Sequence, residues 1–589
     1  MAAWSAAAAR GGRVAAGSLQ WLERHERLVF ALLLALVILP VWLFKYFPAW
    51  DSPLHLRMTD IMARYGERGS EILTQYLVPN QTLEPNLAIY YILLFCSWFV
   101  DLYLAEKILL TLYAVLLACA ARYAVLGVNR AASVFSLLFI PTIFTMFIHM
   151  GLYNFSLSIA LYLLVFGFWY RRRTAMTPLT LAALAALSLV LVLVHLLGFV
   201  LLMVTLGAIT LFDAAHAAFS ASRAADRRDA LSALLRRSLE LGLATLPGLV
   251  VVVSFFARHG LDGGGAVARH RLDLLLRLGV MDHLYSFAQI ELVLYAPFVL
   301  LVAGLVVWTL LARWRGGDRR LQAQDGLAFG AAVVALLYFF VPITTKDVSI
   351  SDRLLPFLFA LTFFWLATAT PGPWLRRSVL TVVALVCVST AGYRVWQYDR
   401  LNGFLEEYVS AADWIAPNST LLPIHFWHDS DARSGRRLTW RTNPLYHAPG
   451  HIGIERNVIN LRNLFLSPEV LGYFPMRYRP QRDPYVHIGK AIDDRPPEVE
   501  FLSYEERTGG SVDYVLVMAT KPVEALEDEE AALVAAQLER GYELIYVSQG
   551  HGFARLYRRR ADDLEEARRL ARMGLDREDR PARAGWPSR

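Results

Sequence analysis

The residues best suited to chemistry stand just after the first hydrophobic segment, in Trp50-Asp51-Ser52-Pro53-Leu54-His55. If a helix begins at Ser52, the carboxylate of Asp51 and the imidazole of His55 share one helical face. Such a carboxylate can act as a general base or a metal ligand, and His55 can orient it or contact a phosphate. The structural alternative is that Asp51 is a helix cap, because Asp-Ser-Pro is a good helix start. The two roles are compatible.

Composition places the chain among membrane proteins before any motif does. Of its 589 residues, 56% are hydrophobic and 19% are charged, and the mean hydropathy is +0.39. These values are typical of a polytopic α-helical membrane protein. The net charge of +7 gathers in short basic connections between apolar runs, which indicates membrane topology and argues against nucleic-acid binding. The three cysteines have no ligand-like spacing and indicate neither disulfides nor a metal site.

The apolar runs predict about eleven membrane spans. The first, residues 28–44, follows a basic flank and has no cleavage site, so we expect an uncleaved anchor with the N-terminus in the cytoplasm. The run 87–100 is short for a span, and we expect it to be re-entrant or interfacial. The later spans are expected at residues 108–126, 131–148, 155–170, 179–194, 197–212, 241–256, 292–312, 327–343, 354–369 and 379–395.

This assignment places every strongly basic connection in the cytoplasm, as the positive-inside rule favours, and leaves the C-terminus outside. The expected location is a bacterial inner membrane. The outer first loop, residues 47–107, contains Leu54, Met58, Ile61, Met62 and Tyr65 at helical spacing. That spacing predicts an amphipathic helix lying in the membrane interface.

Polar residues at the predicted membrane boundaries gather on the outer side. They are Asp51, His55, Glu84, His149, Asn154, His195, Lys346, Asp347, Asp352 and Arg353. An ionisable group within lipid costs about 2.5–3.5 kcal/mol on insertion scales, so such residues are functional candidates. For any single one of them, an ordinary role at a helix end is the alternative.

The composition becomes that of a soluble protein at residues 397–560, between the transmembrane region 28–396 and a charged tail at 561–589. Strands at 421–426, 514–518 and 543–547, with helices at 402–415 and 529–540, predict a small extracytoplasmic α/β domain. Its middle part is rich in histidine and aromatic residues that fit core packing or sugar stacking better than metal binding. These are His425, Trp427, His428, Trp440, Tyr446, His447 and His451.

Several well-known motifs are missing from the sequence. It has no Walker loop, no Gly-x-Gly-x-x-Gly between a strand and a helix, and no Gly-x-Ser-x-Gly. We therefore expect no ATP or nucleotide cofactor. The two halves of the membrane region show no internal repeat, which weakens a secondary-transporter interpretation.

An uncleaved first helix, an acid in the outer first loop, about eleven spans and an outer C-terminal domain together resemble the C-type (GT-C fold) glycosyltransferase superfamily. Its members include protein O-mannosyltransferases and aminoarabinose transferases. The strongest local likeness is Trp50 to His55, which resembles the first-loop acid of that superfamily and an Asp-x-Pro-x-His variant in bacterial relatives. Two further stretches, 86–107 and 151–156 followed by His195, add to the likeness.

The resemblance implies a polyprenyl-phosphate-linked sugar donor, and a glycan, lipid or protein as acceptor. It implies that Asp51 acts as base, with His55 beside it and Glu84 as a loosely matching second acid. A divalent metal ion on Asp51 and Glu84 is left open. Cations at the outer boundary would hold the donor phosphate. The candidates for binding the substrate are Lys346 and Arg353, with His149, Asn154 and His195 as helpers.

Two other classes stay open. A polymerase or ligase type of enzyme would also use outer Arg and His residues with lipid-linked glycans, but usually with a large outer loop between late spans. A non-catalytic transporter or membrane scaffold would keep the spans without needing Asp51.

Overall fold

A computed structural model describes residues 25–82, 84–221, 224–260, 270–315, 321–341, 350–426, 437–493, 497–526 and 529–560. The chain forms two compact units. The helical unit comprises Met1–Lys45, Glu84–Ile89 and Lys107–Tyr398, and the sheet unit comprises Tyr46–Leu83, Tyr90–Glu106 and Asp399–Arg589. Much of the first loop, which we expected to belong to the membrane domain, therefore clusters with the C-terminal part of the chain.

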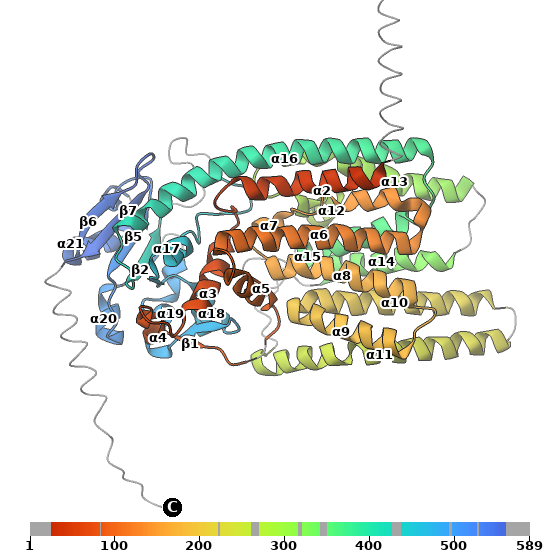
Figure 1. Ribbon diagram of the computed structural model, residues 1–589, viewed down its shortest axis with the longest axis horizontal. Coiled ribbons are helices and arrows are strands. Elements are labelled where there is room, and N and C mark those ends of the chain that lie inside the picture. Colours follow the sequence, from red (N-terminus) through yellow and green to blue (C-terminus); the bar gives the residue numbers. More distant parts are fainter. Residues whose placement is uncertain are drawn as a thin grey trace, which may run out of the picture. The chain divides into compact units, whose positions relative to one another are not determined.

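Long apolar helices dominate the helical unit (Figure 1). Eight described helices are long and apolar enough to cross a membrane. They are α2 (Glu26–Leu43), α6 (Leu102–Val128), α8 (Tyr153–Arg172), α10 (Leu196–Ser220), α11 (Ala224–His259), α13 (Ile290–Arg315), α14 (Gly326–Phe340), which η3 (Ala323–Asp325) extends to Ala323–Phe340, and α16 (Pro373–Val409), which η4 (Ser410–Trp414) extends to Trp414. A helix satisfies all of its backbone groups internally, as lipid requires. The protein is thus a helical membrane protein.

Two further predicted spans are present as helices that are not among these eight. They are α9 (Pro178–Val194), close to its predicted bounds, and α15 (Ile350–Leu366), with 17 residues each. The predicted span 131–148 is wrong. A 3-10 helix, η1 (Arg130–Phe139), is followed by a turn and then by the single-turn helix α7 (Met146–His149). Pro141 stands in that turn, where its missing N–H and fixed φ do not allow a helix to continue.

The short apolar run after the first loop forms α5 (Ala88–Ser97), a helix of 10 residues. At 1.5 Å per residue such a helix is roughly 15 Å long, about half of the hydrocarbon thickness. Its length is therefore too small for a crossing, in keeping with the expectation for residues 87–100.

The sheet unit contains a five-stranded sheet of order β3-β2-β5-β7-β6 (Figure 1). Its strands are β2 (Thr420–His425), β3 (Ile459–Asn460), β5 (Tyr514–Met518), β6 (Tyr542–Val547) and β7 (Ala554–Arg559). Strand β2 pairs in parallel with β3 and β5, whereas β7 is antiparallel to β5 and β6. The predicted strands and the helix α21 (Glu529–Gly541) are confirmed, whereas β7, with three arginines among its six residues, was not predicted.

Segments of the first loop complete the sheet unit. After α3 (Ser52–Arg64) and α4 (Glu71–Tyr76), strand β1 (Leu77–Pro79) pairs antiparallel with β4 (Met476–Tyr478). Helix α3 exists, but the prediction that it lies in the membrane interface is wrong, because residues 52–61 are all buried in protein.

The burial of α3 depends on two glycines of α17 (Pro449–Arg456). A Cβ atom on Gly450 would come within 2.5 Å of the backbone oxygen of Pro53, and one on Gly453 within 2.9 Å of the Arg57 side chain. Only glycine allows the two helices to approach so closely.

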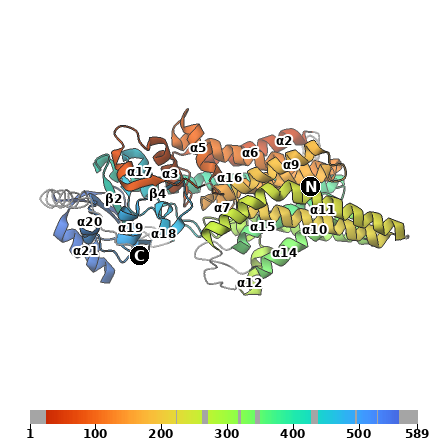
Figure 2. The same cartoon turned by 90° about the horizontal axis from the view of Figure 1, so that it is seen from below.

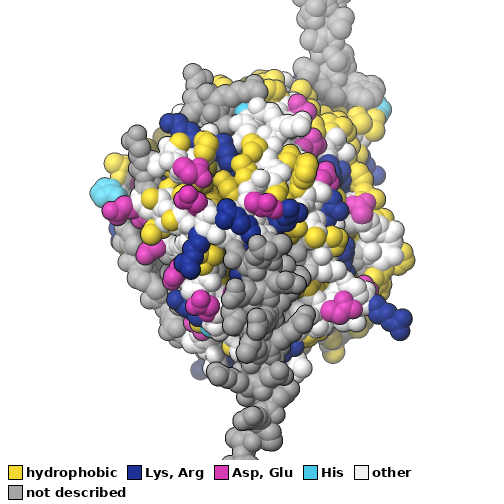
Figure 3. Space-filling model, turned by 90° about the vertical axis from the view of Figure 1, so that its left-hand side faces the viewer, with side chains coloured by type: hydrophobic (Ala, Val, Ile, Leu, Met, Phe, Trp, Pro, Cys, Tyr) yellow, Lys and Arg dark blue, Asp and Glu magenta, His cyan; other side chains and the backbone are white. Residues whose placement is uncertain are grey.

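The surfaces of the two units differ in kind. Figure 3 shows the side of the molecule on which α21 and β6 lie in Figure 1. On this face, Lys and Arg side chains lie among Asp and Glu side chains. Among the charged residues of the sheet unit, Arg558 and Glu543 form an exposed ion pair, whose atoms are 2.6 Å apart. In the helical unit, by contrast, large apolar side chains such as Leu300 and Val293 are mostly exposed. An apolar surface of that kind is suited to lipid.

Candidate functional site

Asp51 stands at the N-cap of α3, but its side chain makes no capping hydrogen bond. Its backbone carbonyl accepts from the amides of Leu54 and His55, each at 3.1 Å. One carboxylate oxygen instead lies 3.5 Å from Nε2 of His447. The side chain of Asp51 is 22% exposed, while that of His447 is 5% exposed. The capping alternative is therefore wrong for the side chain, and the accessible member of this acid–imidazole pair is the carboxylate.

His55 is held in the sheet unit by a tyrosine. Its Nδ1 lies 2.7 Å from the hydroxyl of Tyr90, and its ring packs against Phe465 with centroids 5.2 Å apart. Burial, with smaller contributions from Tyr473 and Asp51, raises the pKa of Tyr90 well above its usual value. The phenol therefore remains protonated and can donate to Nδ1 of His55.

Aromatic and basic side chains position the His447 segment. The neighbouring Tyr446 meets Trp50 edge to face at 5.7 Å and lies under the guanidinium of Arg462 at 4.4 Å. Arg462 also contacts Nδ1 of His425 at 2.6 Å and Asp493 at 2.9 Å. Although burial alone would lower it, Asp493 and nearby tyrosines raise the pKa of Arg462 above its usual value. A permanent cation thus anchors the loop that carries His447.

A buried ionic network fixes α3, the helix that carries Asp51. Arg57 pairs with Asp60, and Nε of Arg64 is 2.8 Å from the other Asp60 oxygen. Arg57 also donates to the Val458 carbonyl at 2.9 Å. The side chains of Arg57 and Asp60 are 1% and 5% exposed. These bonds attach the start of α3 to the strand β3 region and so limit where Asp51 can be.

A second buried contact joins the start of α3 to α6. The hydroxyl of Ser52 donates to the carboxylate of Glu106, and both side chains are fully enclosed. Sequence reasoning missed Glu106, Arg57 and Asp60 as positioning residues. A charged residue within an apolar helical pattern was the available signal for all of them.

The other candidates belong to the helical unit, where most are engaged in local structure. Glu84 is buried, and its two oxygens lie 3.2 Å from Arg258 and 3.2 Å from His259, at the end of α11. Asn154 accepts from the Ile89 amide at 3.1 Å and donates to the Asn86 carbonyl. Both residues therefore hold the chain segment that leads into α5.

The two histidines of the helical unit have defined partners. In His149, Nδ1 is 2.8 Å from Ser286 and Nε2 is 2.7 Å from the hydroxyl of Tyr398, so both ring nitrogens are occupied. His195 accepts from the Leu197 amide at 3.2 Å and caps α10. Burial, helped by the charge of Arg353, lowers the pKa of His195 to about 3, so the ring is neutral and can accept this bond.

Arg353 lies in the first turn of α15, with its guanidinium 5.6 Å from the ring centre of Phe155. The same ring packs edge to face on His195 at 5.3 Å. The structure thus brings Arg353 and His195 together around one phenylalanine. Lys346 and Asp347 lie outside the described residues.

The predicted residues are shared between the two units. Asp51 and His55 belong to the sheet unit, whereas Glu84, His149, Asn154, His195 and Arg353 belong to the helical unit. Within the described part of the chain, no group of three or more His, Cys, Asp or Glu residues is arranged to hold a metal ion.

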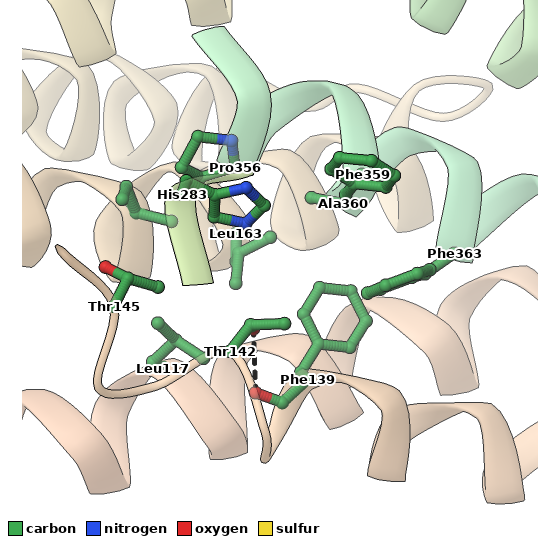
Figure 4. A pocket seen from close by; sticks show the side chains of 11 residues that line it. Leu117, Phe139, Thr142, Thr145, Leu163, His283, Pro356, Phe359, Ala360 and Phe363 are labelled. Atoms are coloured by element: carbon green, nitrogen blue, oxygen red, sulfur yellow. Dashed lines mark hydrogen bonds between the residues drawn. The ribbon is translucent and has the colours of Figure 1, made fainter. Parts of the chain in front are cut away.

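A pocket inside the helical unit contains none of the predicted residues (Figure 4). Its wall is mostly apolar, and Pro356, Phe359 and Phe363 of α15 form one side. The hydroxyl of Thr142 donates to the Phe139 carbonyl at 2.9 Å. This lining offers no group for acid–base chemistry apart from His283, whose ring stacks on Phe359.

A scan of the chain against protein-family models finds no match, and a search of curated proteins finds none either.

Proposed function

We propose that the protein is a membrane glycosyltransferase that moves a sugar from a polyprenyl-phosphate-linked donor to an acceptor on the extracytoplasmic side. The observation that supports it best is the state of Asp51. Its carboxylate stands at a helix start without capping it, is partly exposed, and lies beside the buried His447. A general base needs this combination of access and a fixed partner.

In the proposed reaction Asp51 accepts the proton of the acceptor hydroxyl. The acceptor oxygen then forms a bond to the anomeric carbon of the sugar, and the bond from that carbon to the phosphate oxygen breaks. The departing phosphate keeps the electron pair. An N–H of His447 donated to Asp51 would orient the carboxylate and hold it in place before the transfer.

The departing phosphate requires positive charge and hydrogen-bond donors. The candidates for this task are Arg353 as the main residue, the neutral His195 as helper, and Lys346 as a further cation. Glu84 fits a structural role better than a catalytic one, because its carboxylate is buried against Arg258 and His259.

The decisive experiment is sugar transfer by purified protein in lipid, comparing the wild type with Asp51→Asn. The substitution removes the charge of the base but keeps the shape of the side chain. We expect transfer to fall by roughly 10²–10⁴-fold, with donor binding and the melting curve unchanged. Transfer close to the wild-type rate would refute the assignment of Asp51.

His447 supplies the matched comparison. If it only orients Asp51, His447→Asn should lower transfer less than Asp51→Asn does, and the double variant should be no slower than Asp51→Asn alone. If the fold-losses in transfer rate of the two single variants multiply in the double variant, the two residues act in separate steps.

The proposed orientation has its own test in intact cells. In a cysteine-free background, a single cysteine at the exposed position Thr174 should be protected from an impermeant thiol reagent, and one at the exposed position Arg68 should be labelled. The reverse labelling pattern would mean that Asp51 faces the cytoplasm. It would contradict the proposal of a donor on the extracytoplasmic side.

A further inference from the structure

A second polar site lies in the helical unit, at the Arg-rich ends of its helices. An open cavity lies among the C-terminal end of α8, the C-terminal half of α10 and the first turns of α11. Helices α10 and α11 run side by side in both views (Figures 1 and 2). The polar residues lining the cavity are Arg173, Thr174, Thr210, Asp213, His216 and Arg237.

Both signs of charge face this cavity. Arg173 and Arg237 share one oxygen of Asp213, at 3.5 Å and 3.3 Å. The nearby Glu240, which lines an adjoining pocket with Arg173 and Arg237, pairs weakly with Arg236 at 3.9 Å. His216 is engaged through Nε2 with the Leu321 carbonyl at 2.8 Å. The cluster of two arginines and Asp213 thus retains one net positive charge.

Hydrogen-bonding capacity at the cavity is left unused. The second oxygen of Asp213, Nε of Arg237 and the hydroxyl of Thr210 are buried and have no hydrogen-bond partner. Thr210 is only 3% exposed, so water does not satisfy it easily. Unused donors beside an unused acceptor fit a ligand that carries both an anionic and a cationic group.

The surroundings of the cavity are suited to a lipid. The cavity face of α11 carries Ala230, Ala233, Leu234 and Arg237, and the next face carries Leu231, Leu235 and Leu239. These three leucines are 57%, 65% and 64% exposed and follow one another at helical spacing. An acyl chain can cover this stripe while its headgroup enters the cavity, as at other basic pockets near helix ends in membrane proteins.

We propose that this cavity binds a phosphoethanolamine headgroup, as presented by an amino-phospholipid. The phosphate oxygens accept from Arg237, Arg173 and the Thr210 hydroxyl. The primary ammonium donates to the free oxygen of Asp213. This assignment is independent of the sugar transfer proposed for Asp51, because all of its residues lie in the helical unit.

The test is lipid retention by the purified full-length protein, measured by native mass spectrometry after delipidation and re-addition of defined lipids. Phosphatidylethanolamine should be retained about ten- to a hundredfold better than phosphatidylcholine, whose quaternary ammonium cannot donate a hydrogen bond. Phosphatidylglycerol, which has the phosphate but no ammonium, should fall in between. Equal retention of all three would overturn the proposal.

Variants separate the two halves of the headgroup. Arg237→Gln should weaken both phosphatidylethanolamine and phosphatidylglycerol, whereas Asp213→Asn should weaken only the former. The control is Arg236→Gln, on the neighbouring, 68% exposed position. If Asp213→Asn fails to fold, Thr210→Val replaces it, with a smaller loss expected for both lipids. Loss of both lipids in Asp213→Asn at unchanged melting temperature would contradict the ammonium contact.

Free O-phosphoethanolamine distinguishes the source of the ligand. If the headgroup alone is recognised, millimolar O-phosphoethanolamine should displace the bound lipid, and inorganic phosphate should do so less well. Displacement by inorganic phosphate alone would reduce the cavity to an anion site and overturn the ammonium assignment.

Discussion

Polar residues at helix starts behave differently in two parts of the sheet unit. Asp101, at the start of α6, accepts hydrogen bonds from the amides of Tyr103 and Leu104, both at 3.0 Å, and is an ordinary cap. Asp51, at the start of α3, makes no such bond and faces His447 instead. Both residues are aspartates that directly precede a helix. One carboxylate caps its own helix, yet the other contacts a histidine of a loop distant in the sequence. The environment of a helix start, and not its sequence, decides which carboxylate can do chemistry.

The helical unit extends the comparison. There, several polar residues expected at an outer active site are bonded to backbone groups or to other side chains, as Asn154, Glu84 and His149 are. In lipid an unsatisfied polar group is costly, so such residues are often retained for structure. Among the predicted residues of the helical unit, the cation Arg353 is therefore the main functional candidate.

The largest expected effect concerns the network that holds α3. Arg57→Met removes the main partner of the buried Asp60 and leaves only Arg64 beside it. Breaking a buried ion pair on one side costs about 3–5 kcal/mol, so the sheet unit should be strongly destabilised. The measurement is thermal or denaturant unfolding of the purified protein, and the exposed Arg68→Met is its control. A change below about 1 kcal/mol would mean that α3 is held by packing alone.

A smaller effect is expected at the proposed phosphate site. Arg353→Gln should raise the apparent KM for the donor by about ten- to a hundredfold, the usual value of a hydrogen bond to a charged group. Arg353→Lys should recover only part of this loss, because an ammonium cannot form a bidentate contact. The readout is donor kinetics beside the melting curve. Unchanged kinetics with reduced stability would give Arg353 the same structural role as Asn154.

The smallest expected change in stability comes from replacing the two aspartates, Asp101 and Asp51, by alanine. Asp101→Ala should destabilise the protein by roughly 0.5–2 kcal/mol, the cost of a lost cap, with transfer unaffected. Asp51→Ala should cost less stability than that, since no capping bond is lost, but should abolish most of the transfer. Equal destabilisation by the two substitutions would show that Asp51 caps its helix in solution.

Much of the fold could be predicted from local patterns. Uninterrupted apolar runs predicted the long helices, and a short apolar run predicted β5 at its observed bounds, Tyr514–Met518. Residues 131–148 were mispredicted because hydropathy outweighed Pro141 in that reasoning. Strand β7 was missed because its three arginines obscured the apolar pattern, although it lies between β5 and β6 in the sheet and half of its residues are buried.

The long-range contacts of the site could not be predicted. The burial of α3 depends on Gly450 and Gly453, and the partner of Asp51 is His447, all in the last third of the chain. A single sequence contains no signal that pairs such distant residues. The acid itself could be found from its type and position, but the reason why its carboxylate remains available could not.

The pairing of β1 with β4 has a consequence for biogenesis. Strand β1 is synthesised early and needs a partner that is made only after nearly all of the membrane helices. At ribosomal rates of about 5–20 residues per second, the first loop waits roughly 20–80 seconds before its partner emerges. During that interval the apolar side of α3 is not covered by its partner. We therefore expect chaperones at the membrane surface to bind this loop. For the same reason, a fragment that begins at the C-terminal domain would lack one strand and one core helix and would be prone to aggregate.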